Sequence, residues 1–165
     1  LQPQIVHDLF VKCHEAGIHT CIETSGYTAE ANMRQVLPLT DYVLYDLKIM
    51  DPEKHRQYTG KPNDLILSNA KIIAQSGIET LFRMPLIPGI NDDPPNIKDT
   101  AAFLHGLADN ALRIELMPYH RLGKGKYESL NREYPLPALL APVPERAAAV
   151  KKAFEDYGIA CTVSL

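Results

Sequence analysis

The sequence has 165 residues, enough for one domain with a hydrophobic core, and its 45% hydrophobic and 22% charged content is that of an ordinary globular protein. A formal net charge of −3 gives no basic surface for nucleic acid, and no apolar run is long enough to span a membrane. Three cysteines, Cys13, Cys21 and Cys161, are too few and too scattered for a disulfide scaffold, so we expect a protein of the reducing cytoplasm.

Helix and strand patterns alternate along the chain. Apolar residues at helical spacing predict a first helix over residues 4–16, with Ile5, Leu9, Phe10, Cys13 and Ala16 on one face. The other predicted helices cover residues 28–37, 51–58, 63–76, 95–106 and 144–157. The predicted strands cover residues 19–24, 41–47, 78–87, 112–118 and 160–165, and residues 118–143 are predicted to form a long loop.

This alternation predicts an α/β fold in which parallel strands are joined by helical crossovers. An open doubly wound sheet and a segment of a (β/α) barrel both fit the pattern. In either architecture, binding sites form where the strands end. Ionisable and hydroxyl side chains gather at these carboxyl ends: Glu23, Thr24, Asp46, Lys48, Arg83, Glu115 and His120.

Asp46 and Lys48 are the most informative of these residues. Residues i and i+2 of a strand face the same side, so both side chains could enter one cavity. A surface ion pair at a solvated strand end is the plainer interpretation, worth ~0–1 kcal/mol. Glu23, Arg83 and His120 on neighbouring strand ends favour a binding site. Their mixture of acid, cation and imidazole suits a zwitterionic ligand.

Three other motifs have structural explanations. "CHEAGIHTC" (13–21) fits no closed zinc motif, and buried structural cysteine is the favoured interpretation. His7, His14, His55 and His105 are expected on solvated helix faces. "PLIPGIND" (85–92) reads as a rigid turn, explained by turn chemistry alone. "HRLGKGKYESL" (120–130) lacks the residue order of a phosphate-binding P-loop, and a mobile cationic loop beside the strand ends is the alternative interpretation.

Four motifs in order carry a resemblance to a known family: "IETSG", "YDLKIMDPEKHRQYTG", "RMPLIPGIND" and "ELMPYHRLGKGKYESL". The chain resembles the glycyl-radical enzyme activating enzymes, oxidoreductases of the radical S-adenosylmethionine (radical SAM) superfamily, over essentially its whole length. The resemblance implies an activase of the pyruvate formate-lyase-activating type. Such an enzyme cleaves S-adenosylmethionine reductively and generates a glycyl radical on a partner enzyme, such as pyruvate formate-lyase.

The resemblance also implies roles for the strand-end residues. Glu23, Thr24 and Asp46 would hold a monovalent cation against the methionine carboxylate of S-adenosylmethionine. Lys48 would pair with that carboxylate, and Arg83 and His120 would hold its carboxylate and ribose side. The implied electron donor is a low-potential protein such as flavodoxin or ferredoxin, and neither nucleic acid nor membrane is an implied partner.

The chain departs from the family at the iron–sulfur cluster. The family binds a [4Fe–4S] cluster on a Cys-x-x-x-Cys-x-x-Cys loop, and no such spacing occurs here. We therefore expect no iron–sulfur ligands and no catalytic residue in this chain, and an inactive fragment. The expected fold is a single domain over residues 1–165, the later two-thirds of a radical-SAM (β/α)6 barrel, with the cluster-binding part upstream of residue 1.

Two other functions are compatible with the residues alone. Lys48 at a strand end beside carboxylates could be the nucleophile of a Schiff-base, class I aldolase-like barrel enzyme. Borohydride trapping of a carbonyl substrate on Lys48 would identify that chemistry. Alternatively, the chain could be a non-catalytic docking domain. In that case the Glu23→Ala, Asp46→Ala and Lys48→Ala variants would keep the activity of the full-length protein.

Overall fold

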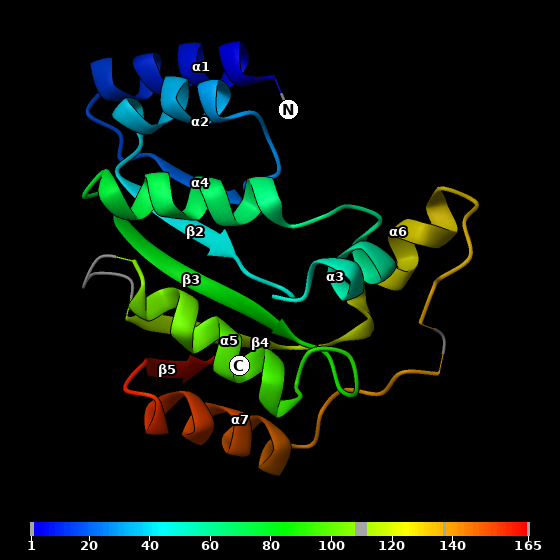
Figure 1. Ribbon diagram of the computed structural model, residues 1–165. Helices are drawn as coiled ribbons and strands as arrows, with labels where there is room; N and C mark the ends of the chain where they lie inside the picture. Colours follow the sequence, from blue (N-terminus) through cyan, green and yellow to red (C-terminus); the bar gives the residue numbers. More distant parts are fainter. Residues whose placement is uncertain (1, 108–111, 137, 165) are drawn as a thin grey trace.

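A computed structural model describes residues 2–107, 112–136 and 138–164; Leu1 and Leu165, the ends of the predicted domain, lie outside the described residues. Within these ranges the chain forms one sheet of five parallel strands in the order β1-β2-β3-β4-β5 (Figure 1). The strands are β1 (Cys21–Thr24), β2 (Tyr42–Asp46), β3 (Glu79–Leu86), β4 (Arg113–Pro118) and β5 (Ala160–Val163). Each lies within a strand predicted from the sequence.

The longer helices are also close to the predicted ones: α1 (Pro3–Glu15), α2 (Glu30–Val36), α3 (Pro52–Thr59), α4 (Asp64–Gln75), α5 (Pro94–His105) and α7 (Pro144–Asp156). Three short elements were not predicted: η1 (Leu37–Leu39), η3 (Arg121–Gly123) and α6 (Lys124–Ser129). The last two lie in the predicted loop 118–143. No residue of either is buried, so their sequence carries no core-facing periodicity.

Two of the helices, α3 and α5, begin with a side-chain cap, whereas the asparagine at the start of α4 makes none. Asp51 accepts a hydrogen bond from Lys54 N at the start of α3, and Asp93 accepts one from Asn96 N at the start of α5. Asn63 precedes α4 but makes no side-chain cap. Its side chain is used elsewhere, as described below.

The predicted apolar face of α1 is only partly correct. Phe10 is buried, but Ile5 and Leu9 are 61% and 57% exposed. Helix α1 lies at the edge of the molecule and packs against α2 and η1, so only one side of it has a partner (Figure 1). A helical apolar pattern shows that a face could be covered, and not that it is.

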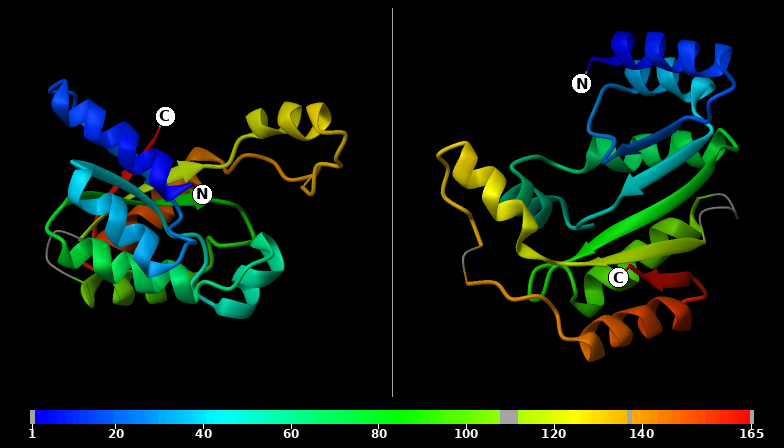
Figure 2. Two further views of the ribbon diagram at one scale, coloured as in Figure 1. Left: turned by 90° about the horizontal axis from the view of Figure 1, so that it is seen from above. Right: turned by 180° about the vertical axis from the view of Figure 1, so that it is seen from behind.

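The strand order decides between the two predicted architectures. A doubly wound sheet reverses its strand order at a switch point, and this sheet does not. Because strand–helix–strand crossovers are right-handed, a sequential order places the connecting helices on the same face. Figure 2 shows β2, β3 and β4 uncovered when the molecule is seen from behind. This is the arrangement of a (β/α) barrel segment.

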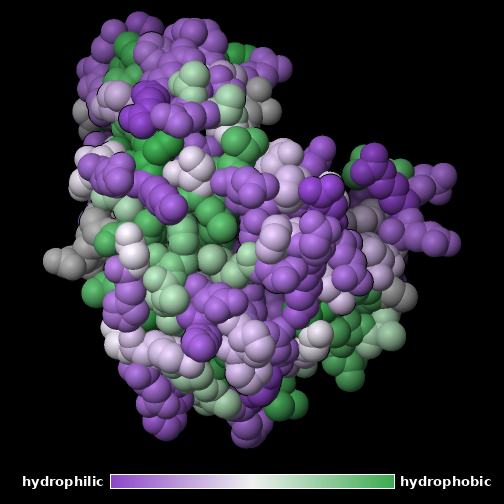
Figure 3. Space-filling view, viewed as in Figure 1, coloured by the Kyte–Doolittle hydropathy of each residue, from purple (hydrophilic) through white to green (hydrophobic). Residues whose placement is uncertain are grey.

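Burial alternates along the strands accordingly. The laterally aligned residues Tyr45, Phe82, Ile114 and Cys161 are buried on the helix-covered face, and the Tyr45 and Phe82 rings meet edge to face at 5.8 Å. On that side, hydrophobic residues show between helices whose outer surfaces are largely hydrophilic (Figure 3). We call the opposite side, which carries Asp46, Arg83 and Glu115, the open face.

Among the described residues, none of the helices combines the length and the apolar character that crossing a membrane requires.

Candidate functional site at the strand ends

The sheet register brings the predicted site residues to one edge of the open face. Asp46 of β2 pairs laterally with Arg83 of β3, and Arg83 with Glu115 of β4. Glu23 of β1 pairs with Leu44, two residues before Asp46. Because side chains alternate across a strand, all four polar side chains project from the open face.

Three of these side chains and Lys48 form a row of alternating charge, Glu23–Arg83–Asp46–Lys48. The Arg83 guanidinium nitrogen Nη2 donates to Glu23 Oε1 and lies 3.2 Å from Asp46 Oδ1. Lys48 Nζ lies 3.2 Å from the other oxygen, Asp46 Oδ2. The row carries no net charge, which offsets part of the cost of burying its two central side chains, Arg83 and Asp46.

Arg83 is the centre of this row. Only 9% of the residue is exposed. Burial lowers the pKa of its guanidinium, but the carboxylates of Glu23 and Asp46 raise it further, so the pKa lies above its ordinary value. Arg83 Nε is buried and has no hydrogen-bond partner among the described residues, so the guanidinium retains a donor that the fold does not use.

The predicted cation ligands are not brought together. The Thr24 hydroxyl accepts a hydrogen bond from Gly26 N, and its side chain borders a small pocket with α1 and α2, on the other side of β1 from Glu23. Between Glu23 and Asp46 stands Arg83. Its guanidinium bridges the two carboxylates as a bound cation would, so the arrangement does not fit a monovalent cation at that position.

His120 is also separate from the row. It follows β4 at the start of η3, is exposed, and its ring nitrogen Nδ1 accepts a hydrogen bond from Leu122 N. The neighbouring Tyr119 N donates to Leu86 O, which fixes the chain at the carboxyl end of β3. His120 therefore lies at the predicted edge but makes no contact with the charged row among the hydrogen bonds of the described residues.

Lys48 borders two pockets. One, of about 430 Å³, is lined mainly by apolar residues of α3, of the turn after β3 and of the long loop: Ile49, Gln57, Tyr58, Thr59, Ile87, Ile90, Asn91, Pro135 and Leu136. The other, of about 160 Å³, is lined by Ser25, Tyr27, His55, Thr59, Lys61 and Ile66. The larger volume lies within the range of small-molecule sites, about 300–1,000 Å³.

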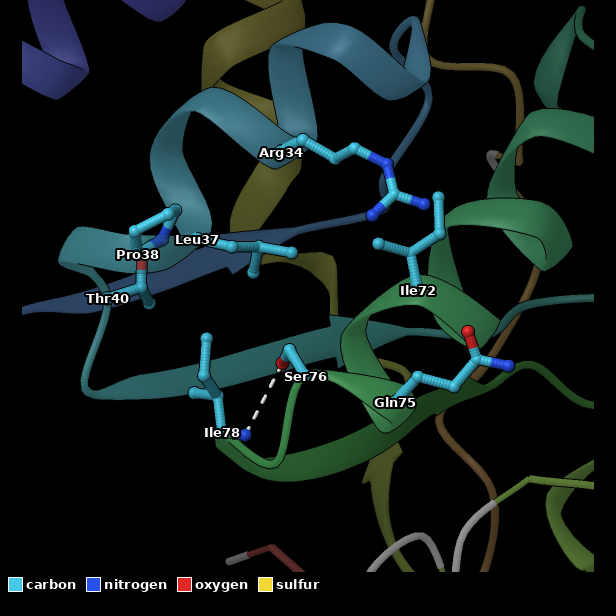
Figure 4. A pocket seen from close by; sticks show the side chains of 8 residues that line it. All are labelled: Arg34, Leu37, Pro38, Thr40, Ile72, Gln75, Ser76 and Ile78. Atoms are coloured by element: carbon cyan, nitrogen blue, oxygen red, sulfur yellow. Dashed lines mark hydrogen bonds between the residues drawn. The ribbon is translucent and has the colours of Figure 1, made fainter.

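A further pocket lies at the opposite end of the strands. It has about 410 Å³ and is formed by α2, η1, the end of α4 and the segment before β3 (Figure 4). Arg34 and Gln75 extend along its rim, and Ser76 Oγ accepts a hydrogen bond from Ile78 N there. Because parallel α/β folds bind ligands at the carboxyl ends of strands, this pocket is the weaker candidate.

Sequence reasoning missed several buried polar residues beside Lys48. Asn63, Asn91 and Asn96 are at most 5% exposed and hydrogen-bond the backbone around Lys48. The prediction that His55 is solvated is wrong: the residue is 3% exposed, and its Nδ1 lies 2.7 Å from Lys61 O. A polar residue on a helix gives no local signal of burial when its partners come from distant segments.

The three cysteines lie far apart in the fold. Cys13 is half-buried on α1, Cys21 is exposed on β1 at one edge of the sheet, and Cys161 is buried on β5 at the other edge. The expectation of buried structural cysteine is therefore wrong for Cys21. Burial raises the pKa of the Cys161 thiol to about 12. In residues 2–107, 112–136 and 138–164, no three His, Cys, Asp or Glu side chains converge as a metal site would need.

Comparisons with known proteins show the family of the chain. The family model described as the radical SAM superfamily matches residues 1–101. The 4-hydroxyphenylacetate decarboxylase activating enzyme of Clostridioides difficile (strain CD196) is 38% identical over 165 residues. The pyruvate formate-lyase 1-activating enzyme of Escherichia coli (strain K12) is 35% identical over 160 residues.

The coverage of these relatives is partial. The matches include 99% and 96% of this chain, but only 52% of the C. difficile protein and 65% of the E. coli protein. Among solved structures, a domain of pyruvate-formate lyase-activating enzyme from Bacteroides vulgatus ATCC 8482 superposes with a TM-score of 0.81 at 28% identity. That match covers 100% of this chain and 92% of the solved one.

Proposed function

Because the chain belongs to the radical SAM superfamily, we propose that it is the S-adenosylmethionine-holding part of a glycyl-radical enzyme activating enzyme. The activity belongs to the larger protein, an oxidoreductase that generates a glycyl radical on its protein substrate. The chain forms a single domain, the later part of a (β/α)6 barrel. The superfamily's own cofactors are S-adenosylmethionine and a [4Fe–4S] cluster.

The observation that carries the proposal is the charged row together with the two pockets that Lys48 borders. S-adenosylmethionine combines a zwitterionic methionine end with an adenosine. Lys48 binds its carboxylate, and Arg83, which bridges Glu23 and Asp46 in the charged row, contributes a second positive charge at the same end of the ligand. Glu23 and Asp46 compensate the ligand's ammonium and sulfonium charges. His120, at the same edge of the sheet, holds the ribose side.

These residues bind and orient the cosubstrate and exclude water around it. When bound, S-adenosylmethionine supplies the group that removes a hydrogen atom from a glycine of the partner. The cysteines of this chain do not fit a cluster, because they lie on α1 and at opposite edges of the sheet. We therefore assign no residue of the chain to the cluster and none to the chemical step itself.

The proposed partners follow from the same class. The protein substrate is a glycyl-radical enzyme, and the electron donor is a low-potential protein such as flavodoxin or ferredoxin, both in the cytoplasm. We propose the class of substrate and not one enzyme. The relatives of similar identity are named for different ones, 4-hydroxyphenylacetate decarboxylase and pyruvate formate-lyase.

A Schiff-base function is less well supported. That chemistry needs a neutral lysine amine as the nucleophile. In the structure, Lys48 Nζ instead forms an ion pair with Asp46 Oδ2 at 3.2 Å.

The test is calorimetric titration of the chain with S-adenosylmethionine. Lys48→Ala is expected to weaken binding at least tenfold, which corresponds to about 1.4 kcal/mol, because the ligand carboxylate loses its ammonium partner. Lys54→Ala is a matched control. Lys54 is also ion-paired, with Asp93 at 2.5 Å, and its side chain is 31% exposed against 32% for Lys48.

Equal affinity of the Lys48→Ala and Lys54→Ala variants would contradict the proposed role of Lys48. Absence of any heat of binding for the unaltered chain, with trapping of a carbonyl compound on Lys48 by borohydride, would replace the proposal with the Schiff-base function.

A further inference from the structure

The segment that carries Lys48 lies beyond the ladder of the sheet. The last backbone hydrogen bond of β2 to β3 runs from Leu47 N to Arg83 O at 2.8 Å. Residues 47–50, which we call the Lys48 segment, nevertheless continue the alternation of the strand. The side chains of Leu47 and Ile49 are buried at 2% and 4% exposure, and Lys48 stays on the open face. Something other than the sheet must hold this backbone extended.

The Asn91 side chain supplies hydrogen bonds to the backbone where the ladder between β2 and β3 ends. Its Nδ2 donates to Lys48 O at 2.9 Å and to Pro85 O at 2.6 Å, and its Oδ1 accepts from Ile87 N at 2.8 Å. One buried amide, 1% exposed, therefore joins the ends of β2 and β3. The motif "PLIPGIND" therefore does more than form a turn: its asparagine also hydrogen-bonds the backbone at the end of the neighbouring strand.

Two further asparagines bind the rest of the segment. Asn63 Nδ2 donates to Ile49 O at 3.1 Å and to Met50 O at 2.7 Å. Asn96 Oδ1 accepts from Met50 N at 2.8 Å, and its Nδ2 donates to Asn91 O at 2.9 Å. The three side chains come from the starts of α4 and α5 and from the turn after β3. We call Asn63, Asn91 and Asn96 the asparagine clamp.

We propose that the asparagine clamp positions Lys48 for the ligand role assigned to it above, so this inference rests on the proposed function. A lysine side chain has four rotatable bonds, and its ammonium finds a fixed place only if its Cα is fixed. The clamp pairs three successive carbonyl oxygens of the Lys48 segment and thereby holds the stem of Lys48 on the side of Asp46. The clamp asparagines are positioning residues, and none of them needs to touch the ligand.

The experiment uses the chain labelled with ¹³C,¹⁵N-lysine. The Cε–Nζ correlation of Lys48 is assigned by its loss in Lys48→Arg. Asn91→Asp replaces the donating Nδ2 with an oxygen, which faces two carbonyl oxygens and repels them. The expected result is a displaced or broadened Lys48 correlation, with that of Lys54 unchanged, and at least tenfold weaker binding of S-adenosylmethionine.

Asn69 supplies a matched control. It is also 1% exposed, and its Nδ2 also donates to two carbonyl oxygens, Gly26 O and Thr28 O, each at 2.8 Å. Asn69→Asp introduces the same repulsion into the loop 25–28, which borders the smaller pocket with Lys48 but does not hold the backbone of Lys48. It is expected to lower the thermal midpoint as Asn91→Asp does, while the Lys48 correlation stays in place.

If Asn91→Asp does not fold, Asn63→Ser carries the test, because it frees Ile49 O and Met50 O without adding a charge. An unmoved Lys48 correlation in a folded clamp variant, or an equal displacement in Asn69→Asp, would overturn the inference. The lysine spectrum does not depend on any ligand. A displaced correlation in a chain that binds no S-adenosylmethionine would therefore support the clamp and contradict only the proposed function.

Discussion

At the scale of single residues, a close contact between Gly26 and Tyr45 fixes the turn that follows Glu23. Tyr45 lies under the loop that follows β1, and its hydroxyl donates to Ile66 O at 2.7 Å. Gly26 sits directly on that hydroxyl: a Cβ at Gly26 would overlap the Tyr45 ring. Its φ of 68° also favours glycine. The turn after Glu23 therefore depends on a contact with β2.

Gly26→Ala is expected to lower the free energy of unfolding by about 3 kcal/mol. About 1 kcal/mol comes from the left-handed backbone, and the rest from displacing Tyr45. Gly17→Ala isolates the backbone part, because Gly17 has the same φ of 68° and nothing within 4 Å of its Cβ position. Urea denaturation of both variants measures the difference. Equal losses would show that the Tyr45 contact carries no energy.

At the scale of secondary-structure elements, α3 and α5 are joined by one ion pair at their amino-terminal turns. Asp93 caps α5 through Asn96 N and pairs with Lys54 of α3 at 2.5 Å. Burial raises the pKa of the Asp93 carboxyl, but Lys54 and the Asn96 amide lower it more, so the pKa lies below 3.8. Lys54 and Asn96 are therefore stronger partners for the charged carboxylate than for the acid.

The lowered pKa of Asp93 predicts that its contribution to the free energy of unfolding decreases at acid pH. A carboxyl whose pKa is lowered by folding stabilises the protein above its unfolded value, and the effect disappears as the pH falls through the folded value. Asp93→Asn keeps a capping side chain but loses the charge. We expect it to be less stable than the unaltered chain at pH 7, by a gap that closes below about pH 4.

Urea denaturation between pH 7 and pH 3 measures this gap. The same cycle in a Lys54→Met background supplies the control, because the part of the gap that depends on the ion pair should vanish there. A gap that persists unchanged at pH 3 would contradict the assignment to the Asp93 carboxylate.

At the scale of the whole molecule, helices cover one side of the sheet. The segment of η3 and α6, residues 121–132, extends away from the sheet, and we call it the arm. Helix α6 projects away from the sheet in both views of Figure 2. None of its residues is buried, and Leu122 and Leu130 beside it are 81% and 64% exposed. The chain returns from this arm through α7 to β5, which pairs with β4. The sheet therefore depends on segments on both sides of the arm.

Limited trypsin digestion is expected to cut first in the arm, after Lys124, Lys126 or Arg132, because its backbone opens at the lowest cost. The two fragments should stay associated in native gel filtration, since β4 and β5 lie on opposite sides of the cut. Lys151 and Lys152 of α7 are the internal comparison. Initial cleavage in α7, or dissociation of the nicked chain, would contradict this description of the molecule.

The sequence by itself determined the alternation of strands and helices and the polar ends of the strands. Those features follow from short-range physics: side-chain period, capping residues and glycine or proline at turns. The motif order also indicated the superfamily before any geometry was known. The pattern of strand ends predicts Glu23, Asp46, Lys48 and Arg83 at one edge of the sheet, and in the structure they form one row.

Only the tertiary structure decided how that row is built. Strand order selected a barrel segment over a doubly wound sheet, and lateral register placed Arg83 between the two carboxylates while Thr24 turned to the other side. Asn91 lies 43 residues from Lys48 in the chain, and its neighbours read as an ordinary turn. The partners of a buried polar group are set by which distant segments meet, and no local pattern records that meeting.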